Sequence, residues 1–396
     1  MIPQKVSGSS TLAMLQKVRE MKAQGMDVIS FAAGEADFPT NPLISETCKM
    51  ALDDGNTKYV STQGLPKLRE AIAQDYQKRF SSKWVQAENV LCAAGSKQAI
   101  HLILSTLTSS ESPCDVLVPA PYWVSYPGIC KALGANIINF KCSEENNFFP
   151  TIDELSKHHT PQTKALIFSS PTNPTGKCIS QKNLQEIVQW AREKKCYLIF
   201  DEIYERLIFN EESQHFSPFS FLSEEESEYV LCVNAFSKSF SMTGWRLGYV
   251  LSHRENIQNL TALQSQVLTC LPGFVQEAAV TAIENADEFI DPVKKIFKKR
   301  MRLLIDGLNA IDGISAFEPE ATFYAFANVK KIIEEFSFKD DRELQQHLLE
   351  KELLVVNPGS AFGMPGYLRF SFATDEETIQ RGLKRLSQFR LSFSGN

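Results

Sequence analysis

Six segments of the sequence place polar or charged residues directly after apolar, strand-like runs. In the first, residues 94–98 (AGSKQ) follow the run Val90–Ala93 and precede the apolar stretch AIHLIL. A Gly-Ser turn that opens a helix presents free backbone N–H groups and the Ser96 hydroxyl, which can bind an anion with help from the helix dipole. The same turn also fits a simple helix N-cap, so this segment alone does not identify a site.

An acidic residue ends the apolar run YLIF. Asp201 follows this run directly, and Tyr204 comes three residues later, on the same side of a helical turn. A carboxylate at the end of a buried strand is costly unless it meets a cation or a hydrogen-bond donor. The pair therefore indicates a ligand site, with a helix N-cap as the alternative.

A lysine and an arginine follow a later apolar run. Lys238, in Phe236-Ser237-Lys238, is a candidate Schiff-base amine, although a surface lysine is the simpler alternative. Arg246 lies eight residues further on beside a Gly turn, and its guanidinium is suited to binding a phosphate through two N–H groups.

Three further residues could complete a binding site. Asn173 lies in a rigid turn, residues 170–176 (SPTNPTG), which would hold its amide toward a fixed ligand. Trp123 follows a strand end and can stack on a planar ring, or it can simply fill the core. Arg369 is a lone cation in an apolar strand and needs an anionic partner.

No single segment decides the function, but their joint presence in this order does. In open α/β sheets, ligands bind outside the carboxyl ends of the strands, where these residues are expected. An anion-binding turn, a stacking ring, a fixed amide, a buried acid, a lysine and two arginines describe a site for a phosphorylated aromatic aldehyde.

The elements that must position these residues alternate between β-rich runs and helical patterns such as Gln181–Lys195. Continuous apolar runs such as ALIF and YLIF suit a sheet that helices cover on both faces. Strand–helix alternation predicts an α/β fold with a mostly parallel sheet. The predicted strands are Val90–Ala93, Asp115–Val118, Asn136–Phe140, Ala165–Phe168, Tyr197–Phe200, Val230–Val233 and Arg246–Leu251.

The pattern changes after about residue 285 and predicts a second, smaller α+β domain. We expect a large domain over residues 46–285 and a small domain over 286–396, with residues 1–45 packing on the small domain. The small domain should contain helices Asp287–Ile311 and Asp341–Lys351 and the strands Ala321–Ala327, Leu353–Val356 and Leu368–Phe372.

Composition excludes several classes of protein. The 396 residues carry a formal net charge of −6, which argues against a dedicated binder of nucleic acid or anionic membranes. No apolar run has the length of a signal peptide or a membrane span, because the uncharged stretch Val116–Cys130 contains three prolines. The nine cysteines lack zinc-ligand spacing, so we expect reduced thiols, no metal site and a cytoplasmic protein.

These segments together resemble the motifs of fold type I pyridoxal-phosphate aminotransferases, specifically the class I group that contains the bacterial aspartate aminotransferases. The resemblance runs from residues 31–35 (FAAGE) to 369–371 (RFS). Its most specific motifs are 173–176 (NPTG), 201–204 (DEIY) and 237–238 (SK) with 243–248 (TGWRLG).

The resemblance implies pyridoxal 5′-phosphate as the cofactor and three catalytic residues. Lys238 would form the Schiff base and then move the substrate proton, so its pKa should be depressed by burial and nearby cations. Asp201 would keep the pyridine nitrogen protonated, while Tyr204 hydrogen-bonds the ring oxygen. The implied cofactor-binding residues are Tyr59, Gly95, Ser96, Lys97, Trp123, Asn173, Asp201, Tyr204, Ser237, Lys238 and Arg246.

Tyr59 matches a family tyrosine that reaches the phosphate of the partner subunit, so the resemblance also implies a homodimer. Arg369 would bind the substrate α-carboxylate through two N–H groups. The implied substrate-binding residues are Thr11, Gly34, Lys97, Trp123, Asn173 and Arg369.

A second substrate carboxylate needs a second cation, and Lys97 occupies the family position that supplies it in one branch of the bacterial aspartate enzymes. Thr11 matches a residue that closes over the substrate in that branch. We therefore expect ping-pong transfer from L-aspartate to 2-oxoglutarate, unless Lys97 is a solvated surface lysine. The alternatives are an aminotransferase for aromatic amino acids or prephenate, and a pyridoxal-phosphate carbon–sulfur β-lyase.

Two residues depart from the family pattern. Ala235 stands where some members have a phosphate-binding serine or threonine, so one phosphate contact is expected to be missing. Thr172 replaces an asparagine that is common in the related turn.

Overall fold

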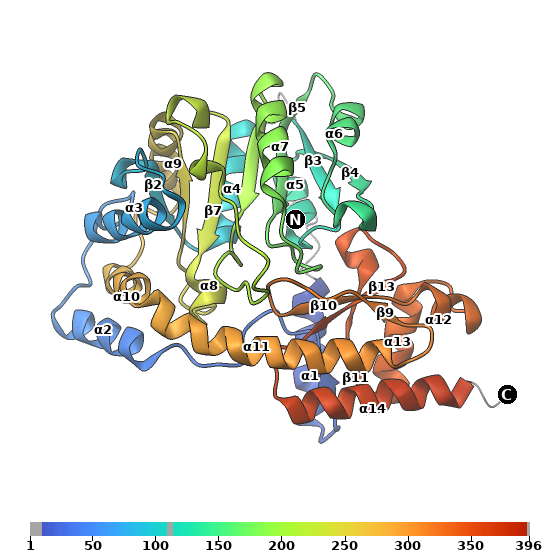
Figure 1. Ribbon diagram of the computed structural model, residues 1–396. Helices are drawn as coiled ribbons and strands as arrows, with labels where there is room; N and C mark the ends of the chain where they lie inside the picture. The colour runs from blue at the N-terminus through green and yellow to red at the C-terminus, as the bar shows by residue number, and fades with distance from the viewer. Residues whose placement is uncertain (1–9, 109–113, 394–396) are drawn as a thin grey trace, which may run out of the picture.

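The computed structural model describes residues 10–108 and 114–393, which form a large seven-stranded part and a smaller part beneath it (Figure 1). The central sheet has the strand order β2-β8-β7-β6-β5-β3-β4. Only β8 runs antiparallel to its neighbours β2 and β7, so the sheet is mostly parallel, as predicted. Its strands are β2 (Val90–Ala93), β3 (Asp115–Ala120), β4 (Asn136–Lys141), β5 (Thr163–Ser169), β6 (Tyr197–Asp201), β7 (Val230–Ala235) and β8 (Gly248–Ser252).

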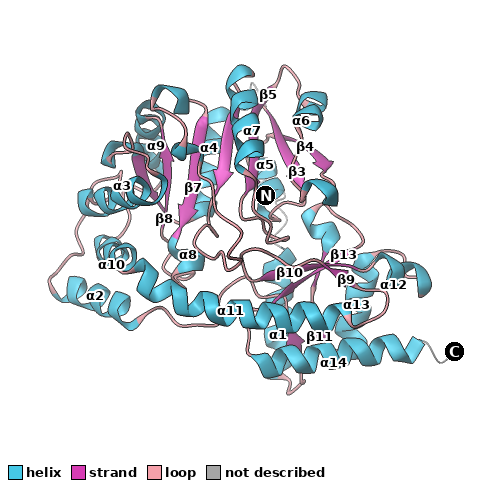
Figure 2. Cartoon of the chain, viewed as in Figure 1, coloured by secondary structure: helices cyan, strands magenta, loops and turns pink. Residues whose placement is uncertain are grey.

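Helices cover both faces of this sheet (Figure 2). One face packs against α4 (Ser96–Leu107), α5 (Ser125–Ala132) and α9 (Arg254–Val267). The other packs against α3 (Pro66–Phe80), α6 (Ile152–His158) and α7 (Gln181–Glu193). Alternate residues of β6 enter different cores, because successive strand side chains point to opposite faces. This explains why YLIF is apolar throughout.

The smaller part contains a four-stranded antiparallel sheet with the order β12-β13-β10-β9. Its strands are β9 (Ser315–Ala316), β10 (Tyr324–Asn328), β12 (Asn357–Pro358) and β13 (Tyr367–Ser371). The helices of this part are α11 (Ala286–Asn309), α12 (Lys330–Glu335), α13 (Asp341–Glu352) and α14 (Glu376–Phe393).

The N-terminal segment adds a strand to the smaller part. β1 (Ile29–Ser30) pairs in parallel with β11 (Leu354–Val355), and Asp27 binds Arg381 and Arg385 of α14. Val18 of α1 (Ser10–Ala23) packs with Val355 in the same apolar cluster. The boundaries at residues 45 and 285 stay predictions.

Several predicted boundaries differ from those of the structure by one or more residues, and three of these differences have a backbone cause. The strand predicted from Arg246 begins at Gly248, because Arg246 has a left-handed φ of 55°. The strand predicted from Ala321 begins at Tyr324, after Thr322 at φ 72°. The helix predicted to reach Lys195 ends at Glu193, and Lys195 has φ 52°. Extended or helical structure does not continue through such residues.

The remaining helices complete the large part. α2 (Pro42–Asp53) packs against α10 (Gly273–Glu284), and the short α8 (Phe236–Ser239) follows β7 directly. Within the residues that the structure describes, no helix is long and apolar enough to cross a membrane.

Candidate active site

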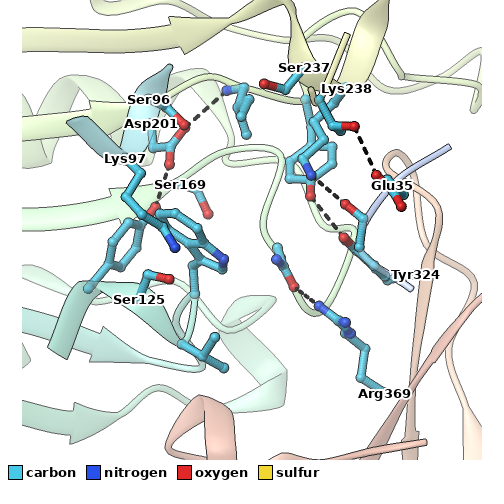
Figure 3. Close-up of a pocket in the computed structure, with 18 of the residues that line it drawn as sticks. Glu35, Ser96, Lys97, Ser125, Ser169, Asp201, Ser237, Lys238, Tyr324 and Arg369 are labelled. Atoms are coloured by element: carbon cyan, nitrogen blue, oxygen red, sulfur yellow. Dashed lines mark hydrogen bonds between the residues drawn. The ribbon is translucent and has the colours of Figure 1, made fainter. Parts of the chain in front are cut away.

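A cavity of about 530 Å³ lies at the carboxyl ends of the parallel strands, where the two sheets approach each other (Figure 3). Segments from both chain ends line it together with the turns after β5, β6 and β7. The structure brings eleven of the predicted residues into its wall: Gly34, Ser96, Lys97, Trp123, Asn173, Asp201, Tyr204, Ser237, Lys238, Arg246 and Arg369.

Lys238 lies in α8, one turn after the end of β7, and its Nζ donates to the carbonyl oxygen of Gly34. Burial, with the positive charge of Arg369 as the next cause, lowers the pKa of this amine from 10.5 to about 8. The predicted depression of the pKa is therefore confirmed. At pH 7 about a tenth of the amine is then in the neutral form, which can act as a nucleophile or base.

Asp201 ends β6 and is 3% exposed. Its Oδ2 accepts a hydrogen bond of 2.8 Å from the Tyr126 hydroxyl, and its Oδ1 accepts one of 3.1 Å from the Ile203 amide. Burial raises the pKa of the carboxyl group to about 6, although the Tyr126 and Ile203 donors oppose the shift. A positively charged ligand group beside this buried carboxylate would strongly stabilise its ionised form.

Trp123 forms one wall of the cavity beside Asp201. Its ring meets Tyr126 edge-on at a centroid distance of 5.4 Å, and the Nζ of Lys97 lies 5.2 Å from the ring centroid. Burial, and secondly the charge of Arg246, lowers the pKa of Lys97. The two cations therefore share one region of the cavity, which favours an anion there.

The turn before α4 and the guanidinium of Arg246 form an anion-binding cradle. Gly95 has φ 83°, a left-handed conformation that favours glycine, and a Cβ at this position would lie 2.5 Å from Nη2 of Arg246 and would displace the guanidinium. Arg246 is fixed by hydrogen bonds from Nη1 to Thr243 O and from Nη2 to Ala94 O. One anion could be bound here by the Arg246 guanidinium, the N-terminus of α4 and the buried hydroxyls of Ser96 and Ser237. A phosphate suits this set of donors.

Arg369 is a buried cation in β13, 3% exposed. Its Nη1 donates to Oδ1 of Asn173 at 2.9 Å, and its Nη2 donates to Ala32 O at 3.3 Å. The guanidinium carbon lies 4.1 Å from the ring centroid of Tyr324 and 4.9 Å from that of Phe362. Its Nε has no hydrogen-bond partner, and within residues 10–108 and 114–393 its other donors bond an amide and a carbonyl oxygen and form no salt bridge. An anionic ligand would satisfy this charge.

Tyr204 lines the same cavity and is 3% exposed. Its hydroxyl lies 3.0 Å from that of Tyr324 in β10. Burial, together with Tyr324, raises the pKa of Tyr204 well above its ordinary value, so the hydroxyl stays protonated and can donate a hydrogen bond.

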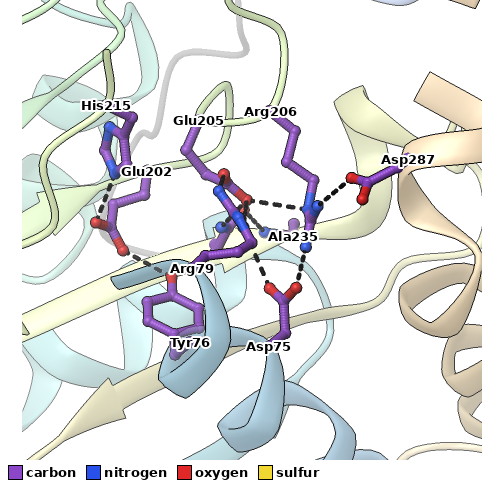
Figure 4. Close-up of polar contacts among 10 residues, drawn as sticks. Asp75, Tyr76, Arg79, Glu202, Glu205, Arg206, His215, Ala235 and Asp287 are labelled. Carbon is purple, nitrogen blue, oxygen red and sulfur yellow. Dashed lines mark hydrogen bonds and ion pairs between the residues drawn. The ribbon is translucent and has the colours of Figure 1, made fainter. Parts of the chain in front are cut away.

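A buried ionic network supports the strand ends behind the cavity (Figure 4). Glu202 accepts a hydrogen bond of 2.7 Å from Tyr76 and lies 2.8 Å from Nε2 of His215. Glu205 pairs with Arg79 and accepts a hydrogen bond from Asn234 of β7. These contacts hold the turn after β6 against β7, so they fix Asp201 relative to Lys238.

Two predicted site residues do not line the cavity, and a third has a side chain outside the described part of the chain. Gly95 lies behind its wall, in contact with Arg246. Tyr59 is 87% exposed and does not face the cavity of its own chain. The backbone of Thr11 belongs to α1, but its side chain lies outside the described part of the chain.

The two departures from the family pattern have local consequences. Thr172 donates a hydrogen bond of 2.8 Å to Ser169 O, so it stabilises the turn that carries Asn173. Ala235 is buried, and its Cβ would be 2.9 Å from a Cβ at Gly248, so the side chain closely packs the β7–β8 pair.

Sequence reasoning missed several residues of the cavity wall. Tyr126 had a usable signal, since it follows Trp123 by one helical turn. Tyr324 had none, because its partner Tyr204 is 120 residues away in the chain. The missed wall residues are Arg19, Glu35, Val124, Ser125, Tyr126, Ser169, Ile203, Thr243 and Tyr324.

Known proteins share this sequence and fold. The family described as aminotransferase class I and II matches residues 26–386. A probable aspartate/prephenate aminotransferase of Aquifex aeolicus is 36% identical over 382 residues, 96% of this chain and 95% of that protein. An asparagine–oxo-acid transaminase of Streptococcus mutans is 32% identical over 382 residues, 96% of each chain.

The solved structure of aspartate aminotransferase from Thermus thermophilus with maleate matches this fold with a TM-score of 0.90, at 33% identity and 97% coverage of both chains. The chain belongs to the class I and II aminotransferases and has the architecture of their fold type I members. It is therefore an aminotransferase, which moves an amino group between small molecules.

Proposed function

We propose that this protein uses pyridoxal 5′-phosphate to transfer the amino group of L-aspartate to 2-oxoglutarate, giving oxaloacetate and L-glutamate. The observation that carries this proposal is Arg369, a buried guanidinium without a carboxylate partner in the described residues, in the same cavity as the low-pKa amine of Lys238. An amino acid brings both groups that this arrangement lacks, a carboxylate for the cation and an amine for the reacting centre.

The residues present fit the cofactor. Ser96, Ser237, Arg246 and the backbone N–H groups at the start of α4 would hold its phosphate. Asp201 would bind its ring nitrogen, Trp123 would stack on the ring, and Asn173 and Tyr204 would bind the ring oxygen. When bound, the protonated ring accepts the electron pair that remains when the substrate loses its Cα proton.

The side chains of this chain supply the other steps. The guanidinium of Arg369 fixes the α-carboxylate of the substrate, which orients the Cα–H bond toward Lys238. The Nζ of Lys238 then accepts and returns the proton, and a positioned base of this kind contributes about two to four orders of magnitude in rate. Asp201 stays ionised beside a positive partner and holds a proton on the ring nitrogen.

The preference for a dicarboxylic substrate rests on Lys97, which we assign to the distal carboxylate together with Thr11. Lys97 lies over Trp123 at the cavity wall, in the region that Arg246 makes cationic. The Thermus thermophilus enzyme, whose structure contains the dicarboxylate maleate, supports this assignment by similarity. The relatives also carry names for prephenate and asparagine, so the amino donor must be measured.

We further propose that the active form is a homodimer, in which Tyr59 reaches the cofactor phosphate of the partner subunit. Tyr59 is 87% exposed, and exposed apolar side chains such as Leu43 and Met50 lie on α2. In the proposed dimer, the partner subunit would cover these exposed side chains. All nine cysteines are free thiols, which fits our proposal of a reducing cytoplasm.

A half-reaction screen tests the proposed function. The protein is loaded with pyridoxal 5′-phosphate and mixed with single amino acids, and the absorbance of the bound cofactor is followed during its conversion to the amine form. Aspartate and glutamate should react fastest, and aspartate with 2-oxoglutarate should yield oxaloacetate. Lys238→Ala should not complete the reaction. Pyruvate release from cysteine conjugates without an oxo acid would instead identify a β-lyase, and preference for aromatic donors would contradict the aspartate assignment.

A further inference from the structure

Tyr324 is a buried residue of β10 that contacts two proposed site residues at once. It is 1% exposed, and its hydroxyl lies 3.0 Å from the hydroxyl of Tyr204. The two rings meet edge-on with a centroid distance of 5.9 Å. A Cβ placed on Gly34, whose carbonyl accepts from Lys238, would lie 3.6 Å from the Tyr324 hydroxyl. The hydroxyl therefore lies among the groups that surround the reacting centre (Figure 3).

The ring of Tyr324 has a second contact, which is independent of its hydroxyl. The guanidinium carbon of Arg369 lies 4.1 Å from the ring centroid of Tyr324 and 4.9 Å from that of Phe362. A planar cation in contact with aromatic rings has restricted freedom to rotate, because stacking favours one plane. The ring thus restricts the orientation of the guanidinium, and the hydroxyl restricts the orientation of Tyr204.

The direction of the hydrogen bond between the tyrosines determines what Tyr204 can do. Each hydroxyl has one proton, so Tyr204 can donate into the cavity only when Tyr324 donates to it. A donated hydrogen bond also polarises the Tyr204 hydroxyl and strengthens its own donation. The contact joins β10 of the four-stranded sheet to the turn after β6 of the seven-stranded sheet. It therefore also connects the sheet that carries Arg369 to the turn that carries Tyr204.

We propose that Tyr324 is a positioning residue that acts through Tyr204 and Arg369: its hydroxyl directs the Tyr204 proton toward the ring oxygen of the cofactor, and its ring holds the Arg369 guanidinium in the plane that receives the substrate carboxylate. This inference rests on the proposed function. It assigns the two effects to different atoms of one side chain, so two substitutions separate them.

Tyr324→Phe removes the hydroxyl and keeps the ring, and Tyr324→Leu removes both. Tyr367→Phe is the matched control, because Tyr367 is a buried tyrosine of the neighbouring strand β13 whose hydroxyl bonds Glu144 at 3.1 Å, outside the cavity. The first measurement is a spectrophotometric pH titration of each protein loaded with pyridoxal 5′-phosphate. The second is the steady-state kcat and KM for the preferred amino acid.

In Tyr324→Phe, the midpoint of the absorbance titration should rise by about half to one pH unit. The reason is that Tyr204 would then donate a weaker hydrogen bond to the ring oxygen of the cofactor, which stabilises the deprotonated form of the bound cofactor less. Its KM should stay within about threefold of wild type, since the stack on Arg369 remains. Tyr324→Leu should add a rise in KM of about tenfold or more. Tyr367→Phe should match wild type in both measurements.

An unchanged titration midpoint in Tyr324→Phe, or an equal rise in KM in Tyr324→Phe and Tyr324→Leu, would overturn the inference while the proposed function stands. A wild-type protein that shows no cofactor absorbance would overturn both. If Tyr324→Leu does not fold, the nearly isosteric Tyr324→Phe still tests the inference, because an unchanged titration midpoint in this variant alone would overturn it.

Discussion

The Oδ1 atom of Asn173 accepts a hydrogen bond of 2.9 Å from Nη1 of Arg369, and this contact joins the ends of two separate sheets. Asn173 lies in the turn after β5 of the seven-stranded sheet, whereas Arg369 lies in the middle of β13 in the four-stranded sheet. In the proposed function, the contact fixes the distance between the cation that would bind the substrate carboxylate and the turn that would face the cofactor ring. A displacement of one sheet relative to the other would therefore change substrate binding.

Arg369→Lys should raise the KM for both the amino acid and the oxo acid by about 100-fold. Lysine keeps the charge but cannot donate two parallel hydrogen bonds to a carboxylate or lie flat against Tyr324 and Phe362. Steady-state kinetics with each substrate varied in turn measures the effect. Arg300→Lys is the control, because this buried arginine already pairs with Asp37 away from the cavity, and its KM values should stay unchanged. Equal effects in both variants would contradict a substrate role for Arg369.

Asp201→Asn should lower kcat by about a thousandfold or more while cofactor absorbance remains. The amide is neutral and cannot keep a proton on the ring nitrogen, so the ring accepts electrons poorly. Single-turnover rates with aspartate measure the loss. Glu202→Gln removes the charge of the next residue, which faces Tyr76 and His215 instead of the cavity, and it should keep kcat within about tenfold of wild type. A wild-type rate in Asp201→Asn would remove Asp201 from the mechanism.

The strands and the residues at their ends were predictable because both are local features of the chain. An apolar run such as YLIF predicts a strand buried on both faces, and a polar residue directly after it must lie at the sheet edge. Arg369 was predictable for a related reason, since a cation inside an apolar strand demands a partner. These signals require no knowledge of which segments meet in space.

Other parts of the site were not predictable, because they depend on long-range contacts. Tyr324 reads as an ordinary core residue in the apolar stretch FYAFA, and only the approach of the two sheets places it beside Tyr204. Glu35 accepts from Thr243, 208 residues away in the chain. The predicted strand boundaries near Arg246 and Thr322 were wrong, because the sequence gives no clear signal for a positive φ at a residue other than glycine.

Arg79→Met should lower the free energy of unfolding by about 3 kcal/mol. The pKa of Glu205 is held below its ordinary value by Arg79 and Arg206, although burial opposes this shift (Figure 4). The substitution removes the first of these cations. It leaves the buried Glu205 carboxylate with Arg206 as its remaining arginine partner. Urea denaturation measures the change. Arg192→Met, which breaks the exposed pair with Glu226, should cost less than about 1 kcal/mol. Similar losses in both variants would show that the network adds no more than a surface pair.

Lys97→Ala should raise the KM for aspartate at least tenfold more than the KM for a neutral amino acid. Only a dicarboxylic substrate places a second negative charge near the Lys97 ammonium, so the ratio of the two effects isolates that contact. Lys141→Ala, at an exposed lysine that ends β4, serves as the control and should change neither KM. If Lys97→Ala raises both KM values equally, Lys97 acts on the cofactor side and the distal carboxylate binds elsewhere.

Lys238→Met should stabilise the cofactor-free protein at pH 7, although it abolishes catalysis. The pKa of Lys238 is lowered from 10.5 to about 8, so protonation of the folded state is disfavoured by about 3 kcal/mol at about 1.4 kcal/mol per pKa unit. Between pH 8 and 10.5 the unfolded chain binds more protons than the folded one, so the stability of the wild-type protein rises with pH over this range. Above pH 10.5 Lys238 is neutral in both states and costs no stability. As the pH falls through 8, the folded protein acquires the full cost of the buried ammonium. Urea denaturation of both cofactor-free proteins at pH 7 and pH 10 should therefore show an advantage for Lys238→Met that falls to about a quarter at the higher pH. Lys141→Met controls for the loss of an exposed lysine. An advantage that is equal at both pH values would mean that packing of the methionine, and not the buried ammonium, explains the difference.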